Sequence, residues 1–438
     1  MKVYNLAIIG GGAAGLMAAA WITKQYRGSK DAPSVLLLEK MPRCGRKINI
    51  TGKGRCNLTN TRMWDEFSPH IHPNSQFFKN SFYGFSSADT MDFFRSIGLE
   101  LTVERGQRVF PKSMRAMDVT DSLVGFIGSE GIVEMRTSVQ VTSVKKTLSY
   151  SELFEIECVA DGGGSSGRQV LLAEKLLVTT GGLSYPSTGS SGDGYDFARS
   201  FGHSIVQCRP SLCALTPVGY KENDGTLTKF GKSLKGLQLK NISLALAVGG
   251  NIVQEEFGEA DFTDGGIEGS LGFRLSRRAV QAMDNCQKTA LIMDLKPQLS
   301  KEQLALRITR EAASGNNTVR YLLSKLLPRQ LIPAFLTLNP QLLQMHGKEA
   351  ANLLPELLKS LRFNIASYIG FERCVVTNGG VSLKEVSQKT MESKLAKNLY
   401  FAGEVLDLDG DTGGYNLQIA FSTAVAAAQN AVRSGEQW

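Results

Sequence analysis

The sequence predicts an α/β protein whose first domain is built from both ends of the chain, with a mixed second domain inserted between them. Three observations predict this. A compact apolar run ends in a glycine cluster at residues 10–15. A second glycine-rich loop, at 403–414, leads into an alanine-rich segment. Between these ends, the spacing of apolar residues in 206–370 is first alternating and then helical.

The composition is that of an ordinary globular protein, apart from its glycine. The chain has 438 residues, of which 42% are hydrophobic and 21% charged, and this length is sufficient for two or three domains. Much of its glycine, 45 residues, is clustered, as is typical of tight turns and of backbone that approaches a ligand. The net charge of +8 favours anionic partners such as phosphates, nucleic acid or membrane surfaces, without choosing among them.

The first glycine cluster lies where a strand predicted at residues 3–9 gives way to a helix. Gly10, Gly12 and Gly15 fit the pattern G-x-G-x-x-G, and the next predicted strand ends at Glu39. Strand, glycine turn, helix and acid-terminated strand form a dinucleotide-binding unit. In such a unit Gly10 permits the turn, Gly12 lets backbone approach a pyrophosphate, and Gly15 lets the helix pack on the strand.

The ligand of this unit is predicted from the residues that follow. Free N–H groups at the helix start, at Ala13 and Ala14, favour phosphates, and Glu39 can accept hydrogen bonds from a ribose diol. Glycines interleave with a run of six basic residues that contains no acid: Lys40, Arg43, Arg46, Lys47, Lys53 and Arg55. A simple NAD domain does not need such a run. The pattern E-x5-G-R resembles the FAD-binding fold of the glutathione-reductase-like superfamily, so FAD is favoured.

Longer segments resemble one family. These are "GRKINITGKGRCNLTN", "RVFPKSMRAMDVTDSL", "GGLSYPSTGSSGDGYDFARSFGH" and "NLYFAGEVLDLDGDTGGYNLQIAFSTA". They are similar to the BaiN/YhiN-like bacterial flavoproteins, which are NAD(P)/FAD-dependent oxidoreductases. The resemblance implies an FAD domain made from two distant segments, an inserted domain, and tightly bound, non-covalent FAD. Cofactor contacts are expected from Lys40, Gly45, Arg46, Lys47, Thr51, Gly52, Gly54, Arg55, Asn57, Val141, Thr180, Gly181 and Gly182.

The C-terminal glycine loop is predicted to close over the flavin. A strand at 398–405 ends in Gly403 and Glu404, and a helix then starts between Gly413 and Leu417. The N-terminus of that helix would stabilise the negative charge of a reduced flavin by roughly 0.3–2 kcal/mol. Glu404 or Asp407 is expected to bind the ribityl hydroxyls, and Gly413 and Gly414 allow backbone to approach the ring. Further cofactor contacts are expected from Gly403, Tyr415, Asn416 and Leu417.

Three segments make up the predicted domains. Residues 1–205 and 371–438 form the Rossmann-like FAD-binding domain. Residues 206–370 form a β-barrel-like plus helical insert, mainly β over 206–298 and mainly helical over 299–362. A loop is predicted at 161–167. In the insert the family commonly carries Phe-Thr-His followed by Ser-Gly-Pro, but here Asp264 replaces the histidine and residues 268–270 read Glu-Gly-Ser. If this loop contacts the substrate, the departure indicates a substrate that differs from those of other family members.

The catalytic residues and the reaction stay open at this point. No second G-x-G-x-x-G lies between a strand and a helix, so either NADH or NADPH docks transiently at the flavin, or another donor or acceptor is used. One hypothesis is a small-molecule oxidoreductase that reduces an activated C=C bond or oxidises an amine. The alternatives are a flavoenzyme that reduces uridine in ribosomal RNA and a redox-responsive binding protein. The sequence does not give the oligomeric state.

Other site types are not predicted. No apolar run approaches the ~18 residues of a membrane span. Counted from Asp407, Thr412 and Gln418 stand where a calcium loop needs glycine and glutamate, and no zinc-type spacing of His and Cys occurs. Seven scattered cysteines indicate a reducing compartment, so a cytoplasmic location is expected. The C-x4-C spacing of Cys208 and Cys213 spans Pro210 and a predicted domain crossing, which argues against a redox pair.

Overall fold

The computed structural model describes residues 2–147, 152–160, 167–313 and 318–432, so most of the predicted loop at 161–167 lies outside the described residues. The chain divides into two compact units. Unit 1 comprises Met1–Arg209 and Val376–Trp438, and unit 2 comprises Pro210–Val375. A two-stranded sheet of β11 (Ile205–Ser211) and β18 (Val376–Val381) lies where the chain passes between them.

Unit 1 contains a seven-stranded sheet in which strands from both chain ends pair. Its main path runs β7-β2-β1-β10-β9-β8, and β19 also pairs with β10. The strands are β1 (Val3–Ile9), β2 (Val35–Leu38), β7 (Val133–Arg136), β8 (Val139–Lys146), β9 (Phe154–Ala160), β10 (Arg168–Val178) and β19 (Leu399–Phe401). Strands β7, β2, β1, β10 and β19 are parallel neighbours, whereas β8 and β9 are antiparallel. The parallel strands therefore end at one common edge.

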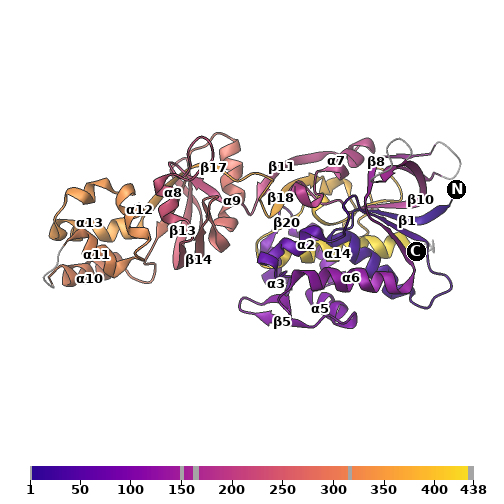
Figure 1. The fold of residues 1–438 in the computed structure, drawn as a ribbon, viewed down its shortest axis with the longest axis horizontal. Helices are drawn as coiled ribbons and strands as arrows, with labels where there is room; N and C mark the ends of the chain where they lie inside the picture. The colour runs from indigo at the N-terminus through magenta and orange to yellow at the C-terminus, as the bar shows by residue number, and fades with distance from the viewer. Residues whose placement is uncertain (1, 148–151, 161–166, 314–317, 433–438) are drawn as a thin grey trace. The chain divides into compact units, whose positions relative to one another are not determined.

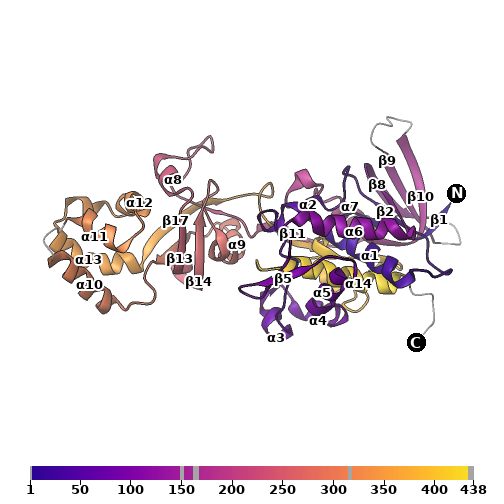
Figure 2. The ribbon, with the colours of Figure 1, turned by 60° about the horizontal axis from the view of Figure 1, so that its bottom comes forward.

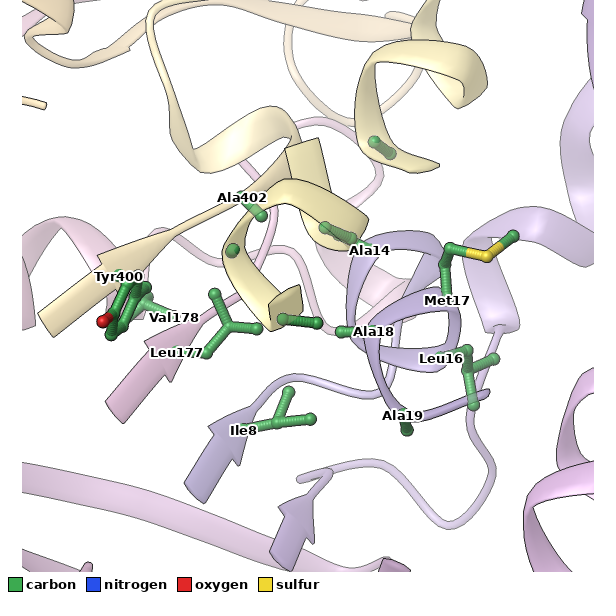
Figure 3. Packing of buried hydrophobic residues seen from close by; sticks show 14 of the residues in the cluster. Ile8, Ala14, Leu16, Met17, Ala18, Ala19, Leu177, Val178, Tyr400 and Ala402 are labelled. Atoms are coloured by element: carbon green, nitrogen blue, oxygen red, sulfur yellow. The ribbon is translucent and has the colours of Figure 1, made fainter. Parts of the chain in front are cut away.

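Two helices at opposite ends of the sequence pack against each other beside this sheet. They are α1 (Ala13–Tyr26), which follows β1, and α14 (Tyr415–Val432), coloured yellow in Figure 1. Figure 3 shows their surroundings, where Ala14 and Ala18 of α1 belong to the same buried cluster as Leu177 and Ala402. Small side chains on both helices allow this close packing.

The rest of unit 1 consists of short elements. The helices are α2 (Arg46–Ile50), α3 (Trp64–Phe67), α4 (Ser75–Gly84), α5 (Ser87–Ser96), α6 (Ala116–Glu130) and α7 (Asp193–Ser200). The 3-10 turns are η1 (Thr51–Gly54), η2 (Ser68–His70), η4 (Pro186–Thr188), η6 (Leu383–Glu385) and η7 (Gly403–Val405). Two small sheets complete this group. One contains β3 (Thr59–Asn60), β6 (Arg108–Pro111) and β5 (Leu101–Glu104), and the other pairs β4 (Ile71–His72) with β20 (Asp409–Gly410).

Unit 2 combines a closed barrel with a group of helices (Figure 2). The barrel order is β12-β15-β14-β13-β16-β17, with β12 (Leu215–Pro217), β13 (Gln238–Val248), β14 (Asn251–Phe262), β15 (Ile267–Glu268), β16 (Thr289–Asp294) and β17 (Leu361–Tyr368). The helices are α8 (Lys229–Leu234), α9 (Gly269–Asp284), α10 (Lys301–Ala313), α11 (Val319–Leu326), α12 (Leu331–Leu338) and α13 (Gly347–Lys359), with the 3-10 turn η5 (Pro340–Gln344). These findings confirm the predicted fold class, although α9 was not anticipated.

Two further observations concern the whole chain. All seven cysteines are free thiols. Among the described helices, none is both long and apolar enough to cross a bilayer.

A buried amide holds the start of α14 in place. The Oε1 atom of Gln418 accepts hydrogen bonds from the hydroxyls of Thr59 (2.6 Å) and Thr90 (2.9 Å). Its Nε2 donates to the Phe85 carbonyl (3.0 Å) and to the Ser422 hydroxyl (2.9 Å). Gln418 is fully buried and makes four hydrogen bonds, so it fixes α14 against β3 and α5.

Replacing this amide by an apolar side chain is expected to destabilise unit 1. Gln418→Leu leaves buried hydroxyls short of partners and should lower the free energy of unfolding by roughly 2–4 kcal/mol. Denaturant titration measures the change. Gln429→Leu, at a partly exposed position of the same helix, is the matched control and should change it by less than about 0.5 kcal/mol. Equal effects of the two variants would contradict the assigned role.

A buried histidine joins two loops of unit 1. His203 contacts the Ser393 hydroxyl through Nε2 (2.7 Å) and the Glu385 carboxylate through Nδ1 (3.2 Å). The order Ser–His–Glu resembles a nucleophile triad. However, the Ser393 oxygen already accepts the amides of Leu395 and Ala396, and the His203 side chain has no exposed surface. The arrangement is therefore structural.

The pH dependence of stability should report on this histidine. Burial lowers the pKa of His203, although Glu385 acts in the opposite direction. Its neutral form therefore stabilises the fold above the unfolded-state pKa of about 6.5, and that contribution is lost below it with a slope of up to about 1.4 kcal/mol per pH unit. Stability measured between pH 8 and 5 should fall less steeply for His203→Gln than for wild type. An unchanged slope in His203→Gln would refute the assignment.

Candidate active site

The sequence-predicted site residues gather where the parallel strands of unit 1 end. Gly10 follows β1, Glu39 follows β2, Thr180 lies just beyond β10, and Gly403 lies just beyond β19. Ligands of open parallel sheets bind at this edge, near a point where the strand order reverses. The structure thus brings segments nearly four hundred residues apart to one edge.

The glycine turn after β1 serves two distinct purposes. A Cβ atom at Gly10 (φ +106°) would lie 2.6 Å from the Thr179 carbonyl oxygen, and one at Gly15 would lie 1.9 Å from the Gly10 carbonyl oxygen. These two glycines are required by packing. A Cβ at Gly12 would meet no described atom within 4 Å. Gly12 caps α1, whose first turn has neither an acidic residue nor a side-chain cap, so the first N–H groups of this 14-residue helix remain suited to an anion.

Glu39 lies directly against this turn. Its carboxylate accepts the amides of Gly11 (2.7 Å) and Met41 (2.8 Å), one on each oxygen. Burial raises the pKa of Glu39, partly offset by these amides. Each carboxylate oxygen keeps a second lone pair for a hydroxyl donor. The Val139 amide donates to the Glu39 backbone carbonyl (3.0 Å), which places the start of β8, and with it the segment of Val141, beside the same edge.

The basic run after Glu39 is partly neutralised within the protein. Lys40 pairs with Asp193 (2.7 Å), Lys47 with Glu404 (2.6 Å) and Arg55 with Glu104 (3.2 Å). Arg46 donates to the Ser187 carbonyl oxygen (3.3 Å). The lysines and arginines of this loop therefore also hold the loop to the rest of unit 1. Sequence reasoning missed these acidic partners because they lie 49–357 residues away.

Glu404 ties the two chain ends together. Besides Lys47, its carboxylate accepts the Ser184 hydroxyl (2.6 Å) and the Thr377 amide (2.8 Å). Burial raises the pKa of Glu404, but the Lys47 ammonium and these hydrogen bonds outweigh it, so the pKa lies below its ordinary value. Ser184 and Thr377 were not predicted, because neither belongs to a motif that marks it. A Cβ at Gly182 would lie 2.5 Å from the Thr377 hydroxyl, so this glycine is required by packing.

The C-terminal loop brings backbone to the same region. Gly413 (φ +132°) and Gly414 (φ +95°) adopt conformations that favour glycine, and α14 starts directly after them. The Asn416 side chain bonds the Gly410 amide (2.8 Å) and carbonyl (2.7 Å), which shapes the loop. Tyr415 is buried, so at this end it is the backbone that a ligand can reach.

Orphaned polar atoms test whether these residues fit an FAD. The Asn57 Oδ1 and Thr180 Oγ1 atoms are among the few buried side-chain polar atoms of the described residues that have no hydrogen-bond partner. Both belong to segments predicted to contact the cofactor. Buried polar atoms normally find partners. Together with the open direction at Gly12, these atoms are what is expected if the residues present hold such a ligand.

Fold and site together define a dinucleotide-binding α/β protein with the architecture of flavin-dependent oxidoreductases. Residues 4–430 match the family described as HI0933-like protein Rossmann domain, and the chain belongs to this family. It is an FAD-dependent oxidoreductase.

Full-length relatives and solved structures agree with this class. The chain is 32% identical to a 3-dehydro-bile acid delta(4,6)-reductase of Clostridium scindens, covering 98% of each chain. It is 29% identical, over 96% of each chain, to a protein named ribosomal RNA dihydrouridine synthase in Haemophilus influenzae. In fold it is similar to a 3-ketosteroid delta1-dehydrogenase of Sterolibacterium denitrificans in complex with 1,4-androstadiene-3,17-dione (TM-score 0.50, 13% identity, 98% and 99% covered). A quinol-fumarate reductase is also similar (TM-score 0.51, 14% identity, 100% and 73% covered).

Two glycine substitutions should separate cofactor binding from folding. Gly12→Ala meets no protein atom and should leave the melting temperature of the apoprotein unchanged while weakening FAD binding at least about tenfold. Gly15→Ala forces a Cβ against backbone and should destabilise the apoprotein by roughly 1–3 kcal/mol. Gly125→Ala, at an exposed position of α6, is the control that should affect neither FAD binding nor folding adversely. FAD binding by Gly12→Ala equal to that of wild type would argue against the phosphate site.

Proposed function

We propose that this protein is an NAD(P)H-linked reductase of a small organic molecule in which a C=C bond is conjugated to a carbonyl group. One observation carries the proposal. The relatives named above, similar over nearly their whole lengths, are named for a bile acid delta(4,6)-reductase and for dihydrouridine synthesis. Both names describe hydrogenation of a C=C bond next to a carbonyl group. The predicted alternative of a flavin-based binding protein gains no support from these enzymes.

The chain's residues would hold FAD along the common strand edge. Gly12 and the amides of Ala13 and Ala14 would bind the pyrophosphate, Glu39 a ribose, and the backbone at Val141 the adenine. The loop from Lys40 to Asn57 and the turn at Thr180, Gly181 and Gly182 would line the middle of the cofactor. Glu404 and Asp407 would orient the ribityl chain, and the backbone from Gly413 to Leu417 would face the ring. Bound FAD supplies two-electron hydride chemistry.

RNA is a second candidate substrate, because a uridine base offers the same conjugated carbonyl. Two relatives, from Haemophilus influenzae and Escherichia coli, are named ribosomal RNA dihydrouridine synthases. Residues 210–375 contain 20 lysines and arginines against 15 aspartates and glutamates, so most of the +8 net charge lies in unit 2. Such charge favours a polyanion, with binding that weakens steeply as salt increases.

Anaerobic reoxidation distinguishes these candidates. The holoprotein is reduced with NADPH, NADH or dithionite and then mixed with cyclohex-2-enone, a 3-oxo-4-ene steroid, or unmodified ribosomal RNA. Cyclohexanone is the matched control without the C=C bond. The proposal predicts rapid reduction by one nicotinamide and reoxidation by an enone, with a stoichiometric amount of saturated ketone. Reoxidation by RNA alone would favour the second candidate, and reoxidation by neither would overturn the reductase proposal.

A further inference from the structure

A cluster of polar side chains lies next to the C-terminal glycine loop, and three of its members lie outside every motif found in the sequence. It consists of Arg62, His70, His72, Asp411 and Tyr415, and we call it the Arg62 cluster. Asp411 lies between the imidazoles, with Oδ2 2.8 Å from His70 Nδ1 and Oδ1 3.3 Å from His72 Nε2. Burial raises the pKa of Asp411, but these contacts outweigh it and lower the pKa to about 2. The carboxylate is thus a fixed negative anchor.

The hydrogen-bond directions follow from the guanidinium. Arg62 Nη1 lies 2.7 Å from His70 Nε2 and donates to the Tyr415 hydroxyl at 2.7 Å. Because a guanidinium only donates, His70 Nε2 must accept, and the His70 proton then lies on Nδ1, facing Asp411. The ring of His70 also stacks on Tyr415, with centroids 4.5 Å apart. His70 is therefore held in one orientation, with Nδ1 toward Asp411, and it fixes the direction of Arg62.

The Arg62 guanidinium has a fixed direction, but its charge is not paired with an acid. Among the described residues it has no carboxylate partner, and its Nη2 and Nε atoms have no hydrogen-bond partner. Three other cations of unit 1, Lys40, Lys47 and Arg55, each pair with an acid. A partly buried guanidinium with one nitrogen fixed and the others available suits an oxygen of a ligand.

The position of the cluster connects it to the site. Asn60, two residues before Arg62, donates from its side chain to the Gly413 carbonyl oxygen (3.2 Å). Asp411 precedes Gly413 by two residues, and Tyr415 is the first residue of α14. Strands β4 and β20, which carry His72 and lead to Asp411, pair directly. The cluster is therefore joined to the backbone that would face the flavin ring.

We propose that Arg62 recognises the carbonyl oxygen of the substrate, with His70 and Asp411 as positioning residues. This inference rests on the proposed function and deepens it. When a conjugated enone is reduced, its β-carbon gains a hydride, the C=C electron pair shifts so that an enolate oxygen forms, and the α-carbon then takes a proton from solvent or a protein acid. Bound FAD, reduced by a nicotinamide, would supply the hydride. A guanidinium at the oxygen stabilises the developing negative charge more than the neutral ketone.

Binding of an enolate mimic tests this proposal independently of turnover. The probe is 4-nitrophenol, whose visible absorbance reports its ionisation, titrated into the oxidised holoprotein. Wild type should bind the phenolate form, and Arg62→Gln should weaken its binding at least about tenfold. Arg62→Lys keeps the charge but loses the fork, and should weaken binding by a smaller factor. His70→Asn should shift the bound probe's ionisation toward the neutral phenol, because Arg62 loses its fixed direction.

Controls separate this inference from folding and from the proposed function. Arg95→Gln, at an exposed ion pair of α5, should bind the probe as wild type does. FAD content and the rate of flavin reduction by dithionite should be unchanged in all variants; if Arg62→Gln does not retain FAD, Arg62→Lys decides. If wild type reduces an enone but Arg62→Gln binds the probe as tightly as wild type does, this inference is overturned and the proposed function stands. If probe binding depends on Arg62 but no enone is reduced, the result supports Arg62 as a binding site for an anionic oxygen and overturns the proposed function.

Discussion

Close approach of backbone from the two ends of the chain is the constraint on which the rest of unit 1 depends. A Cβ at Gly403 would lie 2.9 Å from that of Ala14, just as one at Gly10 would strike the Thr179 carbonyl. Strand β19 pairs with only the last residues of β10, whose first half pairs with β9. The C-terminal strand β19 therefore completes a strand edge that the N-terminal strands begin, and larger side chains would keep the two segments apart.

Electrostatics completes this closure. Glu404 joins the N-terminal loop, through Lys47, to the segments of Ser184 and Thr377. A carboxylate so well paired favours the ionised form, and removing one partner would leave a partly buried charge. Several cations of the basic loop are used in this way. The start of α1, which has neither an acidic residue nor a side-chain cap, would then supply much of the positive field for the phosphates of a bound cofactor.

The sequence predicted those parts of the fold that depend on local pattern. Strand β1, the glycine turn and α1 follow from periodicity and from glycine spacing, and the barrel and helices of unit 2 follow from alternating and helical patterns. The break that Ser138, at φ +56°, introduces between β7 and β8 depends on one backbone conformation that no local pattern marks. Arg62, His70 and His72 were missed because they lie in or beside a short turn and a two-residue strand, where no periodicity exists. The predicted domain limits at 205 and 370 and the individual cofactor contacts stay predictions.

A crystal structure of the holoprotein would show whether both ends of the chain form one flavin site. We expect an FAD whose pyrophosphate lies on the amides of Ala13 and Ala14 and whose ring lies against Gly413 and Gly414. Hydrogen bonds from the cofactor to Asn57 Oδ1 and Thr180 Oγ1 would explain their lack of partners. A flavin bound elsewhere, or a ring directed away from the start of α14, would contradict it.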